Sequence, residues 1–200
     1  MDATEERASP RRPMRADARR NHDLLLRVAA EVFEEQGPYA CLEDIPRRAG
    51  VGVGTFYRHF PNRQAILEAV YREQIDALLA KAAALLEAPS AGEALDAWVQ
   101  LMLDHILKQR GLKAALIDTD RTSATPSTVM PLCKQQMRAA GDALIERAQA
   151  AGVIRTDVRA ADLHQMIHGI VQTADETSEG LAQAQRLVAI MMDGVRVHRQ

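Results

Sequence analysis

The chain has 200 residues, of which 47% are hydrophobic and 26% are charged, and its formal net charge is −2 at pH 7. This composition is typical of a globular protein with one or two small domains. It excludes a membrane-spanning helix, because no apolar run approaches the roughly 20 residues required, and the polar, arginine-rich N-terminus lacks the apolar core of a secretory signal.

Helical periodicity begins with the segment 24–36, whose apolar residues recur about every 3.6 positions. The pattern stops at Gly37 and Pro38, which are helix-ending residues. A second helix is expected to begin near Leu42, with Cys41 in the cap position. Pro46 would then lie about one turn into that helix and should tighten or bend it.

The second helix stops at Ala49 and Gly50, and a glycine-containing turn, Val51 to Gly52, is followed by a third short helix. Phe56 and Phe60 lie four positions apart on one face of that helix and are expected to be buried. Their neighbours turn outward and carry donors suited to phosphates or base edges. Two short helices joined by a tight turn are typical of a helix-turn-helix, whose second helix enters the major groove of DNA.

Residues 42–63 resemble the N-terminal domain of the TetR family of transcriptional regulators. In that family the motif ends in Thr-(Leu/Phe)-Tyr-x-His-Phe and is followed, after two residues, by a basic residue. The run from Thr55 to Phe60, and then Arg63, matches this pattern in order and spacing.

The resemblance implies that Thr55, Tyr57, His59 and Arg63 hold phosphates, while positions 53, 54 and 58 meet bases. Val53 and Gly54 lack hydrogen-bonding side chains, so base discrimination is expected to depend on Arg58 and Arg47, on Glu43 as an open alternative, and on contact of Val53 with a thymine methyl. The expected DNA-binding residues are Arg47, Arg48, Val53, Gly54, Thr55, Tyr57, Arg58, His59 and Arg63.

Pro61 and Asn62 open a long helix that is expected to run to about Glu87. Ser90 and Glu93 form a capping-box pair before the next helix, which Gly111 is expected to break. A short helix over 112–117, a polar loop over 119–126 and a helix from Pro126 to Gly152 follow, with Thr125 as its cap. Two further helices, at about 163–174 and 184–198, close the chain.

No strand pattern or internal repeat is evident, so we expect an all-α fold. The predicted organisation is a three-helix DNA-binding domain at 15–62 and a larger helical regulatory and dimerisation domain at 63–200.

Soft and aromatic side chains recur on the apolar stripes of the second domain. They either fill a core or line an adaptable apolar cavity, and periodicity leaves both possibilities open. The resemblance favours the cavity, because the family usually has a ligand site among these helices. The expected lining residues are Trp98, Met102, His105, Met130, Cys133, Met137 and Met166.

The last two helices are expected to form a homodimer interface as a four-helix bundle, since their apolar stripes are long for helices that cover one small core. The predicted interface residues are Ile170, Val188, Met191 and Val195. A two-fold dimer also suits a palindromic operator, because a single helix-turn-helix makes few contacts.

Metal binding and catalysis have little support in the sequence. His164 and His168 have the spacing of a two-histidine zinc site, but no third ligand is placed, and pocket or interface histidines are the favoured interpretation. Cys41 and Cys133 form no metal spacing and suit a reducing cytoplasm. There is no GxSxG, phosphate loop or HExxH motif. We therefore expect no enzyme activity, metal or cofactor.

The predicted function is that of a cytoplasmic transcriptional regulator, a repressor that a small apolar or amphipathic effector releases from a double-stranded DNA operator. A ligand-independent DNA binder, a scaffold that recruits another protein, and an enzyme with an accessory DNA-binding domain are the alternatives.

Overall fold

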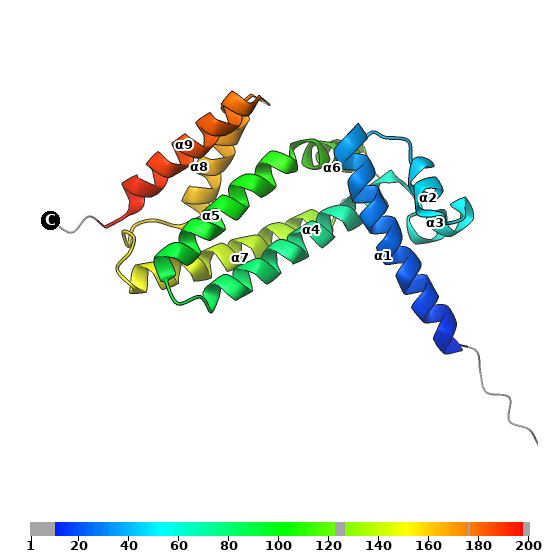
Figure 1. Cartoon of the computed structure of the whole chain (residues 1–200), viewed down its shortest axis with the longest axis horizontal. Coiled ribbons are helices and arrows are strands. Elements are labelled where there is room, and N and C mark those ends of the chain that lie inside the picture. Colours follow the sequence, from blue (N-terminus) through cyan, green and yellow to red (C-terminus); the bar gives the residue numbers. More distant parts are fainter. Residues whose placement is uncertain (1–10, 123–126, 176, 198–200) are drawn as a thin grey trace, which may run out of the picture. The chain divides into compact units, whose positions relative to one another are not determined.

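The computed structural model describes residues 11–122, 127–175 and 177–197, and these residues form an all-α fold, as expected (Figure 1). Its helices are α1 (Arg11–Gln36), α2 (Asp44–Ala49), α3 (Val53–His59), α4 (Arg63–Leu86), α5 (Ala91–Lys108), α6 (Arg110–Thr122), α7 (Val129–Ala150), α8 (Ala160–Thr173) and α9 (Ser178–Val195). Within the described ranges, the extended pairing consists of one isolated bridge between Ile154 and Arg196. None of the helices in this part of the chain has both the length and the apolar character needed to cross a bilayer.

Two compact units divide the chain inside α4, between Val70 and Tyr71. The first turns of α4 therefore group with α1, α2 and α3, and their side chains Ile66, Leu67 and Val70 are buried. The expected domain boundary, between residues 62 and 63, lies before the start of this helix rather than within it.

The N-terminal unit has the core that the apolar pattern predicts. Leu25, Ala29 and Val32 of α1 are fully buried, and α1 packs against α2. The helix ends where expected, at Gln36, because Gly37 adopts a left-handed φ of 82° that favours glycine. It begins much earlier than the apolar pattern indicates, at Arg11.

The start of α2 differs from the expectation, and the difference explains Pro46. The helix begins at Asp44, with Glu43 in the cap position instead of Cys41. Pro46 is thus the third helical residue, in the first turn, where a backbone N–H would have no partner within the helix. Pro46 therefore lies nearer the start of the helix than predicted, where proline breaks no helical hydrogen bond.

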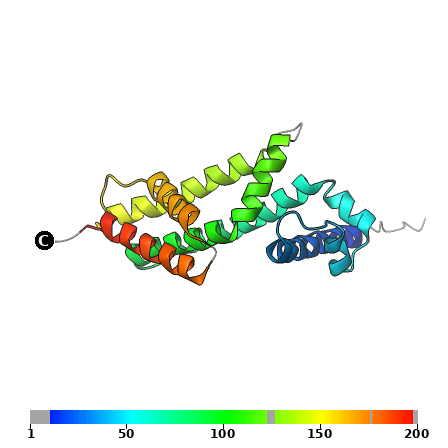
Figure 2. The same cartoon turned by 90° about the horizontal axis from the view of Figure 1, so that it is seen from above.

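The C-terminal unit is built around α5, α7 and α8, which contact one another, and α9 packs on α8 (Figures 1 and 2). Its apolar core includes Leu95 and Leu103 of α5, Leu144 of α7 and Ile167 of α8. The expected cap of α5 is present in part: Ser90 Oγ accepts a hydrogen bond from the backbone N–H of Glu93 at 3.2 Å.

The helix boundaries in the middle of this unit differ from the predicted ones. Gly111 lies within α6 and does not end a helix; the interruption falls at Gln109, between α5 and α6. Helix α6 is also longer than expected and extends to Thr122. Thr125 lies outside the described residues, as does Pro126, and α7 begins at Val129.

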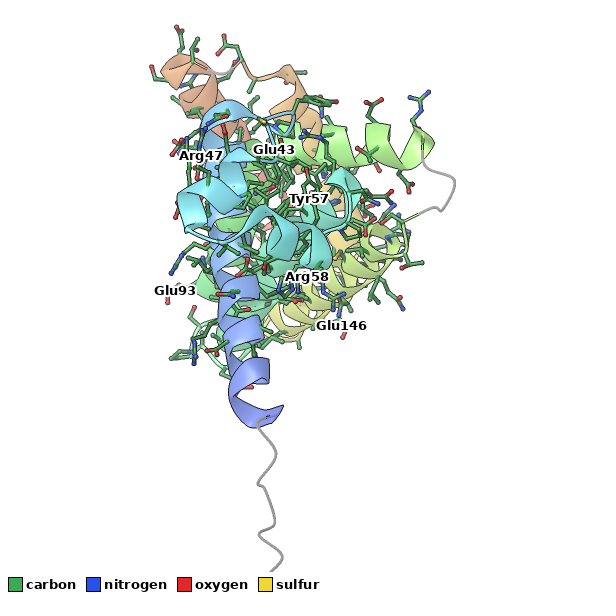
Figure 3. All side chains as sticks on the ribbon, turned by 90° about the vertical axis from the view of Figure 1, so that its right-hand side faces the viewer. Glu43, Arg47, Tyr57, Arg58, Glu93 and Glu146 are labelled. Atoms are coloured by element: carbon green, nitrogen blue, oxygen red, sulfur yellow. The ribbon has the colours of Figure 1, made fainter. Side chains whose placement is uncertain are left out.

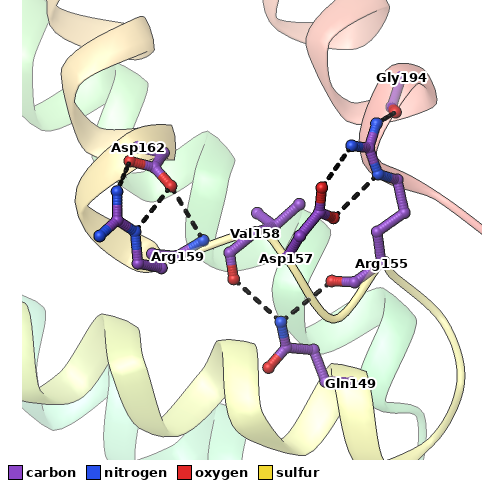
Figure 4. Close-up of polar contacts among 7 residues, drawn as sticks. All are labelled: Gln149, Arg155, Asp157, Val158, Arg159, Asp162 and Gly194. Atoms are coloured by element: carbon purple, nitrogen blue, oxygen red, sulfur yellow. Dashed lines mark hydrogen bonds and ion pairs between the residues drawn. The ribbon is translucent and has the colours of Figure 1, made fainter.

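A polar network fixes the loop between α7 and α8 (Figure 4). Gln149 Nε2 donates to the carbonyl oxygens of Arg155, at 3.0 Å, and Val158, at 2.9 Å. The Arg155 guanidinium pairs with Asp157 and also reaches the carbonyl oxygen of Gly194 in α9, at 3.4 Å. This loop therefore connects the end of α7 to α9.

The end of the described chain is clamped to the same loop. The backbone N–H of Arg155 donates to the Val195 carbonyl at 2.9 Å, and that of Val197 donates to the Val153 carbonyl at 3.0 Å. Arg196 Nη2 adds a 2.6 Å ion pair with Asp96 of α5. The C-terminal segment 195–197 thus holds α9 against the rest of its unit.

Candidate functional site

The turn between α2 and α3 is set by local backbone geometry. Gly50 ends α2 with a left-handed φ of 65°, and Gly52 caps α3 in an extended conformation. The Gly52 carbonyl accepts hydrogen bonds from Thr55 N at 2.8 Å and Phe56 N at 3.1 Å, which starts the helix. The sequence pattern predicts this two-helix unit and its glycine turn, and the structure confirms it.

One face of α3 is anchored in the N-terminal core. Phe56 and Phe60 are buried, as predicted, and their ring centroids lie 5.8 Å apart. The rest of the helix surface is more open: Val53 and Tyr57 are 47% and 37% exposed, and Arg58 is also exposed. Figure 3 shows Tyr57 and Arg58 on α3. A short helix with one anchored face therefore presents an apolar, an aromatic and a cationic group to solvent.

Arginines on this surface are held by neighbours. Arg58 Nε donates to the carbonyl oxygen of Gly54, one turn earlier, at 3.2 Å. Arg47 pairs with Asp44 at 2.7 Å within α2. Arg48 pairs with Glu35 of α1, also at 2.7 Å. The last pair connects α1 to α2, so Arg48 has a structural partner in the absence of DNA.

Tyr57 is held in the same way by an acidic residue. Its hydroxyl donates to Glu43 Oε1 at 3.0 Å, and the thiol of Cys41 donates to Glu43 Oε2, also at 3.0 Å. The Cys41 contact, and then the Tyr57 contact, lower the pKa of Glu43, whereas the bond to Glu43 raises the pKa of Tyr57. A carboxylate thus lies against α3, and the sequence pattern gives no sign of this pairing.

Arg63 has an internal role that the family pattern does not reveal. Its Nη1 and Nη2 atoms donate to the carbonyl oxygens of Pro38 and Ala40, each at 2.8 Å. The guanidinium therefore connects the start of α4 to the segment between α1 and α2. Any phosphate contact by Arg63 must use its other N–H groups or exchange these bonds.

The two other residues expected to contact phosphate are less exposed than Tyr57. Thr55 and His59 are half-buried. The His59 ring lies beside His22 of α1, with the ring centroids 5.6 Å apart. The structure thus brings the predicted residues of α2 and α3 to one surface, with unequal exposure.

The residues expected to line a ligand pocket fall into three groups. Trp98, Met102 and Cys133 are buried, and the first two belong to the core cluster. The second group is half-buried and contains His105, Met130 and Met137. Met166 is 48% exposed, unlike its neighbours Leu163 and Ile167 in α8, so it lies at the surface rather than in the core with Trp98.

The predicted dimer interface requires a larger correction. Val188 and Met191 are 5% and 6% exposed in the single chain because they pack into its own core, and Val195 packs against that core. Ile170 of α8 is partly buried against the same core. These four residues were assigned to a partner on apolar periodicity, which does not tell an internal face from an external one.

A second apolar face on the same helices lies in solvent. Ile190 is 66% exposed, and Leu187, three residues earlier in α9, is also exposed. Met166 of α8, the helix on which α9 packs, is also exposed. The spacing of Leu187 and Ile190 could have indicated this face, but the buried stripe of α9 is the longer signal.

His164 and His168 lie close together on α8, with ring centroids 4.6 Å apart. Lys113 Nζ of α6 lies 3.4 Å from His168 Nε2. Burial, followed by repulsion from Lys113, lowers the pKa of His168 to about 4 and also lowers the pKa of His164. Within the described part of the chain no group of three or more metal-ligating side chains is found, and an ammonium beside the imidazole opposes a metal cation.

Comparisons with known proteins match both units. A family model described as bacterial regulatory proteins of the tetR family matches residues 25–70, and one described as the C-terminal domain of SbtR-like transcriptional regulators matches residues 90–197. The solved structure of the TetR transcriptional regulator SCO0520 from Streptomyces coelicolor is 35% identical, with a TM-score of 0.72. The match covers 89% of this chain and 99% of that chain.

Two further relatives are similar over different lengths. The TetR transcription regulatory protein from Mycobacterium vanbaalenii is 32% identical, with a TM-score of 0.71, over 92% of this chain and 100% of that chain. An HTH-type transcriptional regulator of Staphylococcus aureus is 31% identical over 67 residues, which is 32% of this chain. The match spans about a third of the length of that relative, 35%.

Proposed function

This chain belongs to the TetR family of bacterial regulatory proteins, and we propose that it is a dimeric repressor that a small apolar or amphipathic molecule releases from a palindromic DNA operator. The observation that carries the proposal is the exposed surface of α3. This helix presents Val53, Tyr57 and Arg58 to solvent, while Phe56 anchors it in the core. Arg58 supplies a donor for a base edge, Val53 an apolar contact for a thymine methyl, and Tyr57 a donor for phosphate.

The dimer is proposed to form through the outer face of α8 and α9. Met166, Leu187 and Ile190 leave an apolar surface on adjacent helices, and a second copy of the chain would cover it about a two-fold axis. Two copies would present two α3 helices to the two halves of a palindrome. Membership of the TetR family supports a second copy of the chain, rather than a different protein, as the partner on this surface.

Release by a ligand requires that the ligand favour a conformation with low DNA affinity. A molecule that binds that conformation about a hundredfold better would weaken operator binding by ~2.7 kcal/mol. Trp98 and Met102 lie on one face of α5. They support an apolar or amphipathic effector, because the methionine side chain adapts to ligands of different shape. Repression follows from this arrangement if the operator overlaps a promoter.

The test begins with the full-length protein and fragments of its own genome. Selection of bound fragments should recover a palindrome, and Arg58→Ala should relax discrimination at one position of each half-site. Tyr57→Phe should weaken binding to all sequences to a similar extent. Arg138→Ala, which removes an exposed arginine of α7, is the matched control and should leave both properties unchanged. Recovery of no preferred sequence would overturn the proposal.

Ligand release is tested on the recovered operator. Trp98 is the only tryptophan, so its fluorescence reports binding near α5. A compound that saturates the fluorescence change at the concentrations that dissociate the operator would support an effector role. Operator binding that no compound in a broad apolar and amphipathic screen alters would favour a ligand-independent regulator.

A further inference from the structure

Five basic side chains from four helices of the C-terminal unit lie close enough to interact electrostatically. They are His105 of α5, Lys113 of α6, Lys134 of α7, and His164 and His168 of α8, and we call them the basic cluster. Lys113 and His168 are in direct contact at 3.4 Å, and the rings of His164 and His168 lie edge to face. None of the ion pairs between described residues involves a member of this cluster.

Such a cluster costs free energy, because like charges repel and half-buried charges lose hydration. The protein relieves this cost by keeping imidazoles neutral: burial, with Lys113 and His164 adding to it, lowers the pKa of His105 to about 4. Burial also lowers the pKa of Lys113, and Lys134 adds to that effect. An anion placed among these side chains would offset the repulsion between them.

The basic cluster lies next to an apolar stripe of α5. Trp98, Met102 and His105 share one face of α5, at successive turns, and the first two lie in the core. Beyond His105, Gln109 and then Lys113 follow at intervals of one turn, and the Gln109 side-chain oxygen is buried without a hydrogen-bond partner in the described part of the chain. A polar, cationic end thus adjoins an apolar stripe.

We propose that the basic cluster binds the carboxylate of an organic acid with an apolar body, with Lys113 and His168 as the groups that contact its two oxygens. Lys113 donates from its ammonium to one oxygen, and an imidazole N–H of His168 donates to the other. The apolar body lies toward Met102 and Trp98. This inference rests on the proposed function in one respect, since it identifies the chemical class of the effector.

A carboxylate fits the cluster better than a metal or a dianion. Lys113 repels a cation, and one negative charge compensates one half-buried ammonium. A phosphate would bring a second negative charge, which the one ammonium of Lys113 does not compensate.

Binding should be linked to protons. A bound carboxylate favours the charged form of His168 and His105, against the burial and the repulsion from Lys113 and His164 that keep them neutral. From α4, Tyr71 faces His105 and contributes no charge near neutral pH, because burial raises its pKa to about 12. Complex formation should therefore take up protons, and affinity should rise as the pH falls from 7.5 to 6.

The experiment uses the full-length protein and three probes of equal chain length: octanoate, octan-1-ol and octyl phosphate. Titration calorimetry with Trp98 fluorescence should show octanoate binding about tenfold or more tightly than octan-1-ol, as expected for charge-assisted hydrogen bonds. Calorimetry in buffers of different ionisation enthalpy should show proton uptake at pH 6.5. Lys113→Met should abolish the preference for octanoate and lower the proton uptake, and His168→Asn should reduce both.

Lys108→Met is the matched control, because Lys108 is exposed in the last turn of α5 and should leave octanoate binding unchanged. Thermal unfolding checks that Lys113→Met folds; its midpoint should be equal or higher, since a repelling charge is removed. Equal binding of octanoate and octan-1-ol, or binding of neither, overturns the proposal. Tighter binding of octyl phosphate than of octanoate overturns the carboxylate assignment. If the unaltered protein binds Zn²⁺ and His164→Asn does not, the anion site is overturned.

The recovered operator separates this inference from the proposed function. Octanoate that binds through Lys113 and dissociates the operator supports both. Octanoate that binds through Lys113 without changing operator affinity supports the carboxylate site and contradicts its role in DNA release. A protein that recovers no operator contradicts the proposed function, and the calorimetric result still decides the carboxylate site.

Discussion

The hydroxyl of Tyr57 donates to Glu43, so a side chain expected to contact phosphate is occupied by a carboxylate of its own unit. Arg47 and Arg48 are likewise paired with Asp44 and Glu35. Each pair holds a donor on the surface of α2 and α3 and also places a negative charge beside it. DNA binding must therefore exchange some of these partners, which makes the acidic residues determinants of affinity.

Glu43→Gln should increase affinity for all DNA sequences by about two- to fivefold, because it removes a charge that repels phosphate and loosens the hold on Tyr57. The measurement is a gel-shift or anisotropy titration at several salt concentrations. Glu34→Gln, an equal change of charge at an exposed position of α1, is the control and should have a smaller effect. Equal gains in the two variants would contradict a specific role for Glu43.

Arg63→Ala should lower the stability of the N-terminal unit as well as its DNA affinity. The two 2.8 Å bonds to the Pro38 and Ala40 carbonyls are charge-assisted, and their loss should cost about 1.5–3 kcal/mol. Denaturant unfolding measures this loss, and Arg58→Ala, at an exposed position, should leave stability nearly unchanged. Unchanged stability of Arg63→Ala would show that these bonds contribute little.

At the scale of elements, α9 has two apolar faces with different roles. Val188 and Met191 lie in the core of the unit, whereas Leu187 and Ile190 lie in solvent. The helix therefore packs against its own chain on one side and leaves the other side for the proposed second copy. A charged residue on the inner face should lower the stability of the unit, and one on the outer face should weaken the proposed dimer.

Ile190→Glu should give a folded monomer with little operator affinity, since it places a charge in the proposed interface. Met191→Glu should instead lower thermal stability sharply, because it buries an unpaired carboxylate. Analytical ultracentrifugation and thermal unfolding separate the two results, with exposed Gln185→Glu as the control. An intact dimer of Ile190→Glu would place the interface elsewhere.

Elements with one strong periodicity could be predicted from the sequence, and those that depend on partners could not. The core of α1 and the pair Phe56 and Phe60 follow from spacing alone. The start of α2 does not, because caps are weak local signals that tertiary contacts override. The inner and outer faces of α9 differ only by what packs against them, so periodicity selected the core residue Met191 as an interface residue.

The candidate site shows the same division. The motif from Thr55 to Phe60 predicts which side chains α3 exposes, because that follows from helical geometry. The contacts of Glu43 with Tyr57 and of Lys113 with His168 join residues 14 and 55 positions apart, and no local pattern encodes them. Such pairs follow only from the packing of whole helices.

At the scale of the whole molecule, the neutral histidines make stability depend on pH. His105 and His168 have pKa values of about 4 in the folded protein, below the ordinary value of 6.5, and the pKa of His164 is also lowered. The unfolded chain therefore binds more protons than the folded chain between these values. Stability due to these residues is complete above pH 6.5 and is lost as the pH falls toward 4.

The thermal midpoint of the ligand-free protein should therefore fall as the pH is lowered from 6.5 toward 4, and change little above 7.5. Lys113→Met should reduce this dependence, because it removes a charge that keeps His168 neutral. NMR titration of the imidazole signals provides a direct check. A His168 that titrates near 6.5 in the unaltered protein would contradict the expected behaviour.

The clamp at the end of the chain has a consequence for how the protein is made. Residues 195–197 hold α9 through backbone bonds to Val153 and Arg155 and an ion pair with Asp96. The N-terminal unit can form during synthesis, because its contacts lie within the first 70 residues. The C-terminal unit can close only once residues 195–197 have been synthesised, so a chain truncated after Gly194 should keep a folded N-terminal unit and have an unsecured α9.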